Sequence, residues 1–483
     1  MPELTFAPTR PLNLLAGAGI ALTMATVVYL ADTMGLAAVI ALVGLLLTCF
    51  THPLVPFALY FTALFFKDTT VAALPVSINQ VLAPVFFLAT FIHFLRGRTH
   101  SGRYSLLPLL TLVGCYFILR GVTSEHLETG LIYSRYVLIY LVLAICVALS
   151  LNSERAIMAF TWIIVLITTG FAVHGFLEGV EKNLLAGLAG SWNFSARVVG
   201  TAPNAIVFGW NMVFALPFIF LLYSQSGSRY TRMFALSLST IILIAAAMTF
   251  NRQTYLLIGV VVGLSAILFN YRNRTFLLGI LSVVFTFASL TVLPVIVKRM
   301  LTVTNLGKDY SFLTRRDSFL IGLEMLEKSP IIGMGFGSFS KIWREYLPPE
   351  YTTYFAQYHP GSAEKFLDMG VMAILVETGI IGLILYLILT GAILLHAWNY
   401  RKQAVAAGDT FVQNLASTVF IGIVFAFLTA FIQDNFLYPR IWLLYALVFL
   451  LNPTLLPIQP ANEPRPALPP TPSGGTLPAP AEA

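Results

Sequence analysis

Six arginines lie at or near the ends of apolar segments that are long enough to cross a membrane. When those segments are taken as consecutive spans, the six fall on one face of the membrane, opposite most of the other arginines. Long basic side chains at span ends often reach for lipid headgroups, but several on one face favour an anionic ligand. Guanidinium groups bind phosphate through paired hydrogen bonds, so a phosphate-bearing lipid is the natural candidate. The six are Arg120, Arg135, Arg197, Arg252, Arg315 and Arg316.

Two of these arginines adjoin residues that interrupt helices. Arg197 shortly precedes Pro203-Asn204, and Arg252 follows Asn251 in a connection so short that it must lie at the membrane boundary. A single such arginine contacts lipid headgroups about as often as it binds a ligand. A pyrophosphate needs two or more guanidinium groups in register, so we expect Arg197 and Arg252 to act together.

Two residues on the same face could exchange a proton with a sugar hydroxyl. Asp368 is the last polar residue before an apolar run, where it could act as a base or cap the span. His359 is the alternative base, although a histidine in an aromatic segment more often packs. Glu377 falls on the opposite helix face from Asp368, at about 100° per residue. We therefore expect Glu377 to bond a neighbouring helix or an arginine.

Neither a metal nor a cofactor is expected. The sequence contains no Asp-x-Asp, and the face with the six arginines has no dense cluster of carboxylates. Glycines 333, 335 and 337 do not form a phosphate loop, because they follow a proline and lack the lysine of that motif. They predict a tight turn against the membrane.

The elements that must position these residues are membrane helices. The chain has 483 residues, of which 58% are hydrophobic and 10% charged, which is typical of an integral membrane protein. The apolar runs are continuous rather than alternating, which excludes an outer-membrane β-barrel. We predict an all-α transmembrane bundle of about 12–14 spans. The predicted spans are 12–31, 33–50, 54–66 (short, re-entrant or tilted), 80–95, 105–119, 131–150, 157–177, 203–223, 233–250, 253–270, 275–297, 369–395, 412–432 and 440–457.

Most of the other arginines lie in connections that alternate along the chain, as expected for cytoplasmic loops. This pattern places both termini in the cytoplasm and the connections 120–130, 178–202, 250–253, 298–368 and 432–440 outside. The net charge of +7 follows from these loops and does not indicate nucleic-acid binding. The three cysteines lie inside apolar runs and are expected to pack there.

Four regions are expected. Residues 1–297 form an N-terminal transmembrane bundle and 369–457 the C-terminal transmembrane helices. Between them, 298–368 form a large loop with an amphipathic helix on the bilayer or the bundle, its apolar face made by Phe319, Leu320, Leu323 and Leu326 and its end at Ser329-Pro330. Residues 458–483 form a disordered, Pro-rich tail.

The order of several motifs resembles the O-antigen ligase and polysaccharide polymerase superfamily. An outer arginine precedes a span with Pro203-Asn204, a second arginine, Arg252, opens a later span, and Arg316 lies in a helix that leads to a P-x-x-G-x-G-x-x-x-F turn. A large outer loop then closes on LVETGIIG. The resemblance covers roughly residues 190–395.

The resemblance implies a glycosyltransferase of GT-C-like architecture in the bacterial cytoplasmic (inner) membrane. It would transfer glycan from undecaprenyl pyrophosphate to an acceptor glycan, with inversion and without metal or nucleotide. Its partners would be these lipid-linked glycans, the bilayer, and chain-length regulator and flippase proteins. Arg197 and Arg252 would bind the pyrophosphate, with Arg120, Arg135 and Arg316 as supporting cations.

Within the family, ligases place a histidine where this chain has Asp368, whereas many polymerases have an acidic residue there. The sequence therefore favours a polymerase of O-antigen, capsule or exopolysaccharide repeats. A ligase that moves finished glycan to lipid A core or protein is the alternative. A transporter is a third possibility, but no internal repeat or set of polar residues near the bilayer midplane is evident.

Overall fold

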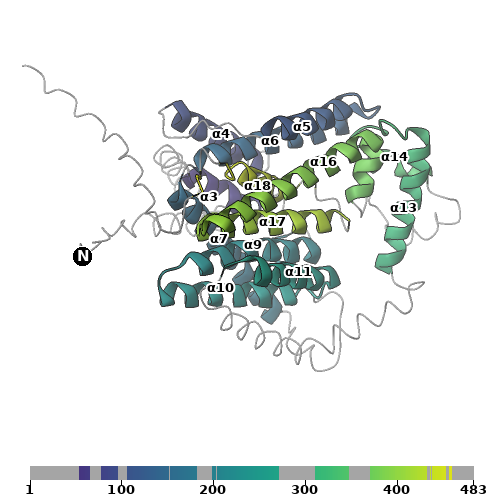
Figure 1. The fold of residues 1–483 in the computed structure, drawn as a ribbon. Helices are drawn as coiled ribbons and strands as arrows, with labels where there is room; N and C mark the ends of the chain where they lie inside the picture. The colour runs from purple at the N-terminus through teal and green to yellow at the C-terminus, as the bar shows by residue number, and fades with distance from the viewer. Residues whose placement is uncertain are drawn as a thin grey trace, which may run out of the picture.

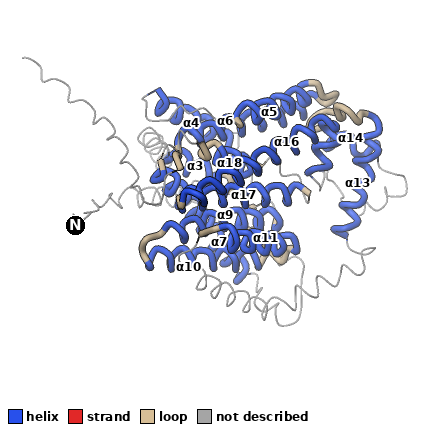
Figure 2. Tube along the Cα trace, viewed as in Figure 1, coloured by secondary structure: helices blue, strands red, loops and turns tan. Residues whose placement is uncertain are grey.

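The computed structural model describes residues 54–65, 78–95, 106–151, 153–181, 198–202, 204–270, 310–346, 370–431, 436, 438–452 and 456–458. All regular structure in these ranges is helical (Figure 2). Six of the helices are long and apolar enough to cross a membrane. The predicted all-α polytopic fold is therefore confirmed. The helices are α3 (Leu54–Ala63), α4 (Ile78–Leu95), α5 (Leu107–Val122), α6 (Leu127–Ser150), α7 (Glu154–Glu181), α9 (Ala205–Gln225), α10 (Arg229–Ala247), α11 (Arg252–Leu268), α13 (Tyr310–Lys328), α14 (Phe339–Ile342), the 3-10 turn η3 (Trp343–Tyr346), α16 (Gly370–Ala407), α17 (Thr410–Ala430) and α18 (Pro439–Val448).

The bundle is organised around α9. Its sequence is apolar on every face, as expected for a helix enclosed by others, and 94% of its most apolar window is buried. Helices α7, α10, α11 and α17 pack around it. Figure 1 shows α5, α6, α9, α10 and α11 running across the molecule, with α13 and α14 beyond one end of this group.

We call that end the site end. Helices α3, α5, α7 and α10 finish there, and α6, α9, α11 and α18 begin there. Hydrogen bonds join these termini, as described below. The opposite end holds the start of α10 and the finish of α16, where Arg229 and Arg401 lie. Arg120 and Arg252 thus lie at the site end, and Arg229 and Arg401 lie towards the opposite end.

Two elements differ from the sequence prediction, and a third agrees with it. Helix α16 continues to Ala407, so that much of the predicted connection 396–411 is helical. Helix α18 has only ten residues, fewer than the predicted span 440–457. Helix α3 also has ten residues, about 15 Å at 1.5 Å per residue, in agreement with the expected short element.

Helix α13 ends at Lys328, directly before the predicted stop at Ser329-Pro330. It packs on α16 through Ile321 and Met325, next to Gly322. The predicted apolar face, with Phe319, Leu320 and Leu323, is instead exposed. Since Gly322 has no side chain, the helix can approach α16 on the other face, and α13 therefore presents two apolar faces.

Candidate functional site

The site end contains a broken membrane helix. Helix α16 is interrupted at Gly379, which has φ 69° and ψ −174°. Such a break removes hydrogen bonds within the helix, and in hydrocarbon each unpaired backbone group costs several kcal/mol. The segment 330–335 supplies the missing partners. The four bonds run from Met334 N to Val376 O (2.9 Å), from Gly335 N to Glu377 O (2.9 Å), from Ile380 N to Pro330 O (3.0 Å) and from Ile381 N to Ile331 O (3.3 Å).

Three glycines within residues 330–338 are required by the backbone conformation there. Gly333, Gly335 and Gly337 have φ of 76°, 104° and 84°, a region that residues with a side chain rarely adopt. A Cβ on Gly333 would lie 2.4 Å from the backbone nitrogen of Gly379. The sequence prediction of a tight turn is confirmed, but the turn packs on α16 and on the α5–α6 hairpin. We call residues 330–338 the glycine turn.

Glu377 completes the contact between α16 and the glycine turn. Its side chain is buried, and its Oε1 accepts a hydrogen bond from Phe339 N at 3.1 Å, at the start of α14. The expectation that it bonds a neighbouring helix is confirmed. Glu377 therefore has a positioning role.

Arg120 holds the other side of the glycine turn. Its Nη2 donates to Gly333 O at 3.0 Å, its Nη1 donates to Thr123 Oγ1 at 2.8 Å, and its own carbonyl accepts from Phe336 N at 3.2 Å. The end of α5, the glycine turn and the break in α16 are thus one hydrogen-bonded unit.

Arg252 lies at the corner between α10 and α11. It is half-buried and is the first residue of α11, whose N-terminus is capped by the Asn251 side chain accepting from Gln253 N at 3.2 Å. Phe250 has φ 47°, the one positive value at a non-glycine residue in the described ranges. Strained backbone of this kind often marks functional positions. Here it turns the chain sharply enough to place Arg252 at the site end.

The loop 198–202 is fixed by contacts to three helices. The Glu178 carboxylate, on α7, accepts from the backbone of Val199 and Gly200. Thr201 Oγ1 donates to Phe65 O at 2.6 Å, just beyond α3, and Val198 N donates to Met248 O, just beyond α10, at 3.4 Å. This loop follows Arg197 in the chain.

The Pro203-Asn204 motif has a local explanation. Asn204 caps α9, because its Oδ1 accepts from Val207 N at 2.9 Å. Amide and carboxylate side chains at this position satisfy backbone N–H groups that the first helical turn leaves unpaired.

The remaining predicted site residues are not gathered with these. Arg135 is on the exposed face of α6, beside the ring of Tyr136, and Arg316 is on the exposed side of α13. Arg197, His359 and Asp368 lie outside the described residues. Their roles stay predictions.

The sequence analysis overlooked one basic residue at the site end. Arg440, the second residue of α18, is 6% exposed, and its Nη2 donates to Leu64 O at 2.8 Å. It lies in the connection 432–440 that was placed outside with the other arginines. Its position in that connection is the feature of the sequence that could have identified Arg440 as a candidate.

Aromatic rings join the two halves of the site end. Phe436 stacks on Phe117 of α5 with ring centroids 4.4 Å apart, and its carbonyl accepts from Trp442 Nε1 of α18 at 2.9 Å. Phe336 of the glycine turn contacts Phe117 at 5.2 Å. The start of α18 therefore lies between the glycine turn and the α3 terminus.

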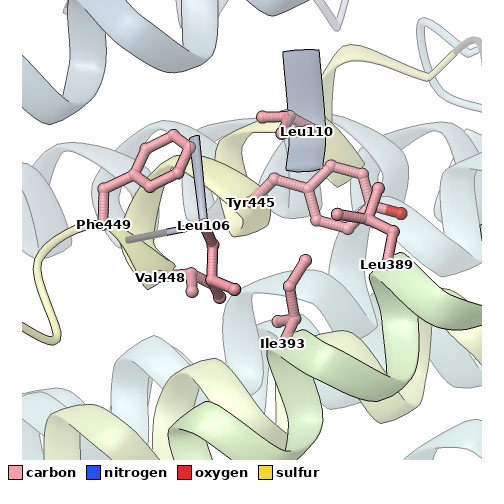
Figure 3. Close-up of a pocket in the computed structure, with 7 residues that line it drawn as sticks. All are labelled: Leu106, Leu110, Leu389, Ile393, Tyr445, Val448 and Phe449. Atoms are coloured by element: carbon pink, nitrogen blue, oxygen red, sulfur yellow. The ribbon is translucent and has the colours of Figure 1, made fainter. Parts of the chain in front are cut away.

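An apolar recess elsewhere in the bundle has no part in this site. It lies between α5, α16 and α18, and only Tyr445 brings a hydroxyl to a lining that is otherwise aliphatic or phenyl (Figure 3). Leu106 and Leu110 line it near the start of α5, whereas Arg120 lies about 15 Å further along the helix at 1.5 Å per residue. The recess offers no cation to an anionic ligand.

Part of the chain matches a known protein family. Residues 235–387 match the family model described as O-antigen ligase. The match includes the α10–α11 corner with Arg252, the helix α13, the glycine turn and the break in α16. No curated protein matches the chain. Over residues 235–387, the chain is therefore similar to the O-antigen ligase family, which supports the resemblance seen in the sequence.

Proposed function

We propose that this protein polymerises undecaprenyl-pyrophosphate-linked oligosaccharide repeats on the outer face of the bacterial cytoplasmic membrane. The observation that carries the proposal is the half-buried Arg252 at the start of α11, close in sequence to the strained Phe250 and at the end of the bundle where the glycine turn meets the broken α16. A guanidinium group at this position can bind phosphate oxygens through paired hydrogen bonds. The family match supports a lipid-linked glycan as the source of that phosphate.

The proposed reaction is a single displacement. The acceptor hydroxyl oxygen forms a bond to the anomeric carbon, the bond from that carbon to the pyrophosphate oxygen breaks, and undecaprenyl pyrophosphate leaves with the electron pair. The hydroxyl proton passes to Asp368 or, alternatively, to His359. Attack from the side opposite the leaving group inverts the anomeric configuration.

Arg252 and Arg197 are proposed to bind the leaving pyrophosphate and to stabilise its growing negative charge. Fixed cations of this kind act most strongly in the transition state, where the charge develops. Arg135 and Arg316 are proposed as supporting cations. Arg120 has that proposed role too, in addition to the contacts through which it positions the glycine turn.

A ligase is the second candidate, and the description of the matched family favours it. Asp368 favours the polymerase, because the related ligases have a histidine at that position. Purified protein given lipid-linked repeats of one defined length separates the two. A polymerase makes a ladder of longer lipid-linked products from that substrate alone.

A ligase leaves the repeat length unchanged and requires added lipid A core or protein acceptor. A protein that consumes neither substrate, but whose deletion traps glycan inside the cell, would be a transporter. Either of these outcomes would contradict the proposed polymerase.

A further inference from the structure

Arg440 is buried, and part of its guanidinium group makes no hydrogen bond. One N–H donates to Leu64 O, and the Cζ atom lies 4.3 Å from the centre of the Phe65 ring. The Nε atom is buried without a hydrogen-bond partner. A guanidinium group has five N–H donors and no acceptor. Among the residues that the structure describes, no carboxylate pairs with it.

Arg401, at the opposite end of the bundle, shows how this chain builds a structural arginine. Its Nε and Nη2 both donate to Leu268 O, at 3.3 and 2.9 Å, and its Nε also contacts Ser417 Oγ at 3.2 Å. Its Cζ lies 5.3 Å from the ring centre of Trp398. Both arginines thus bond a carbonyl at the end of a helix and lie against an aromatic ring. Of these two arginines, only Arg440 leaves its Nε unpaired.

Further unpaired polar groups lie on the elements next to Arg440 and Arg252. The Tyr438 ring, two residues before Arg440, is 6.2 Å from the indole of Trp210. Trp210 Nε1 and Asn251 Nδ2 are buried without partners in the described structure, and Asn251 directly precedes Arg252. Thr254 Oγ1 is also buried without a partner, against Gly209. Folded proteins pair the great majority of their buried polar groups, so such a cluster calls for an explanation.

The loop 198–202 connects the two arginine positions. Thr201 bonds the carbonyl of Phe65, whose ring lies against Arg440, and Val198 bonds the carbonyl of Met248, near the start of α11. Arg440 and Arg252 therefore lie at the two sides of this loop. Three of the unpaired groups are N–H donors, at Arg440, Trp210 and Asn251. A surplus of donors suits a ligand rich in acceptor oxygens, such as a phosphate.

We propose that Arg440 is a further phosphate-binding residue of this site. The inference rests on the proposed function, since the phosphate would be that of the lipid-linked glycan. In this proposal Arg440 Nε and Trp210 Nε1 both donate to the pyrophosphate oxygens, Arg440 from the α18 side of the loop 198–202. Arg252 binds the same group from the α11 side.

Binding of undecaprenyl pyrophosphate without glycan tests this role separately from catalysis. The full chain in lipid nanodiscs is titrated with that lipid, and the rise in unfolding temperature reports binding. Arg440→Gln should weaken binding by about tenfold or more, because charge-assisted hydrogen bonds are lost. Arg440→Lys should weaken it less, since a point charge replaces only part of the guanidinium geometry. Arg401→Gln is the matched control and should bind as the wild type does.

Unchanged affinity in Arg440→Gln would overturn the inference. If Arg252→Ala nevertheless weakened binding, the proposed function would stand without Arg440. If the wild type did not bind the lipid at all, both proposals would fall. If Arg440→Gln does not accumulate, lipid binding by Arg440→Lys tests the inference instead. Wild-type affinity in Arg440→Lys would then contradict it.

Asp434→Asn provides a second control, because Asp434 is the carboxylate nearest to Arg440 in the sequence. If Asp434→Asn and Arg440→Gln lowered the unfolding temperature equally and left lipid binding intact, Arg440 would serve an internal ion pair. That result would also overturn the inference.

Discussion

Replacing Gly333 with alanine should release the glycine turn from the broken α16. Gly333 has φ 76°, and a Cβ there would lie 2.4 Å from Gly379 N and 2.5 Å from both Glu377 C and Thr378 N. All three atoms belong to the backbone of α16, so no side chain can move aside to make room. The turn must shift, or α16 must.

The structure gives the size of the effect. Backbone strain at a positive φ costs about 1–3 kcal/mol. Moving the turn breaks the bonds from Met334 N and Gly335 N to α16 and from Arg120 to the carbonyl of residue 333. Three such bonds contribute about 0.5–1.5 kcal/mol each. The protein can either keep the turn in place and bear the strain, or move the turn and lose the bonds, so the two costs do not add in full. We therefore expect the free energy of unfolding to fall by about 2–4 kcal/mol.

Thermal unfolding of the purified protein in detergent measures this loss. Gly391→Ala is the matched control, because Gly391 lies in the same helix α16 and a Cβ there meets nothing within 4 Å. Alanine at such a helical position should be neutral or stabilising, by up to about 1 kcal/mol. If Gly333→Ala unfolded at the wild-type temperature, the glycine turn would not be docked on α16 as described.

Three other predictions concern topology and chemistry. In a cysteine-free background, an impermeant thiol reagent applied to whole cells should label Glu345→Cys and not Ser228→Cys. The two positions are exposed and lie at opposite ends of the bundle. The reverse labelling pattern would mean that the predicted topology is inverted. Turnover should persist in excess chelator, and a loss that magnesium or manganese restores would show a metal requirement. Asp368→Asn should slow turnover by about 10²–10⁴ if Asp368 is the general base, while His359→Gln should have the smaller effect. Mild losses in both variants would leave neither residue as the base.

Much of the helical framework could be predicted from the sequence, because burial in a bilayer requires long apolar segments. The end of α13 could also be predicted, since Ser329-Pro330 cannot continue a helix. The break at Gly379 could not. It lies inside the predicted span 369–395, and the groups that satisfy it come from the glycine turn, more distant in sequence.

Arg440 shows a second limit of prediction from the sequence. A basic residue at a span end gives the same sequence signal whether it reaches lipid headgroups or is enclosed by the protein. Arg440 is enclosed because the short α3 ends beside it and offers the carbonyl of Leu64. Such a contact between residues far apart in sequence is set by tertiary packing, which hydropathy does not record. For the same reason the sequence could not show that Arg135 faces outward.

The most direct test of the central claim compares Arg252 with Arg229. Each is the first residue of a helix, and each follows a side-chain cap, Asn251 for α11 and Ser228 for α10, but the two lie at opposite ends of the bundle. The measurement is the rate of undecaprenyl pyrophosphate release from purified lipid-linked repeats. Arg252→Ala should slow release by about 10²–10³, the usual loss when a group that stabilises transition-state charge is removed. Arg229→Ala should release the lipid at the wild-type rate. Equal rates in the two variants would contradict an anion site at this end of the bundle.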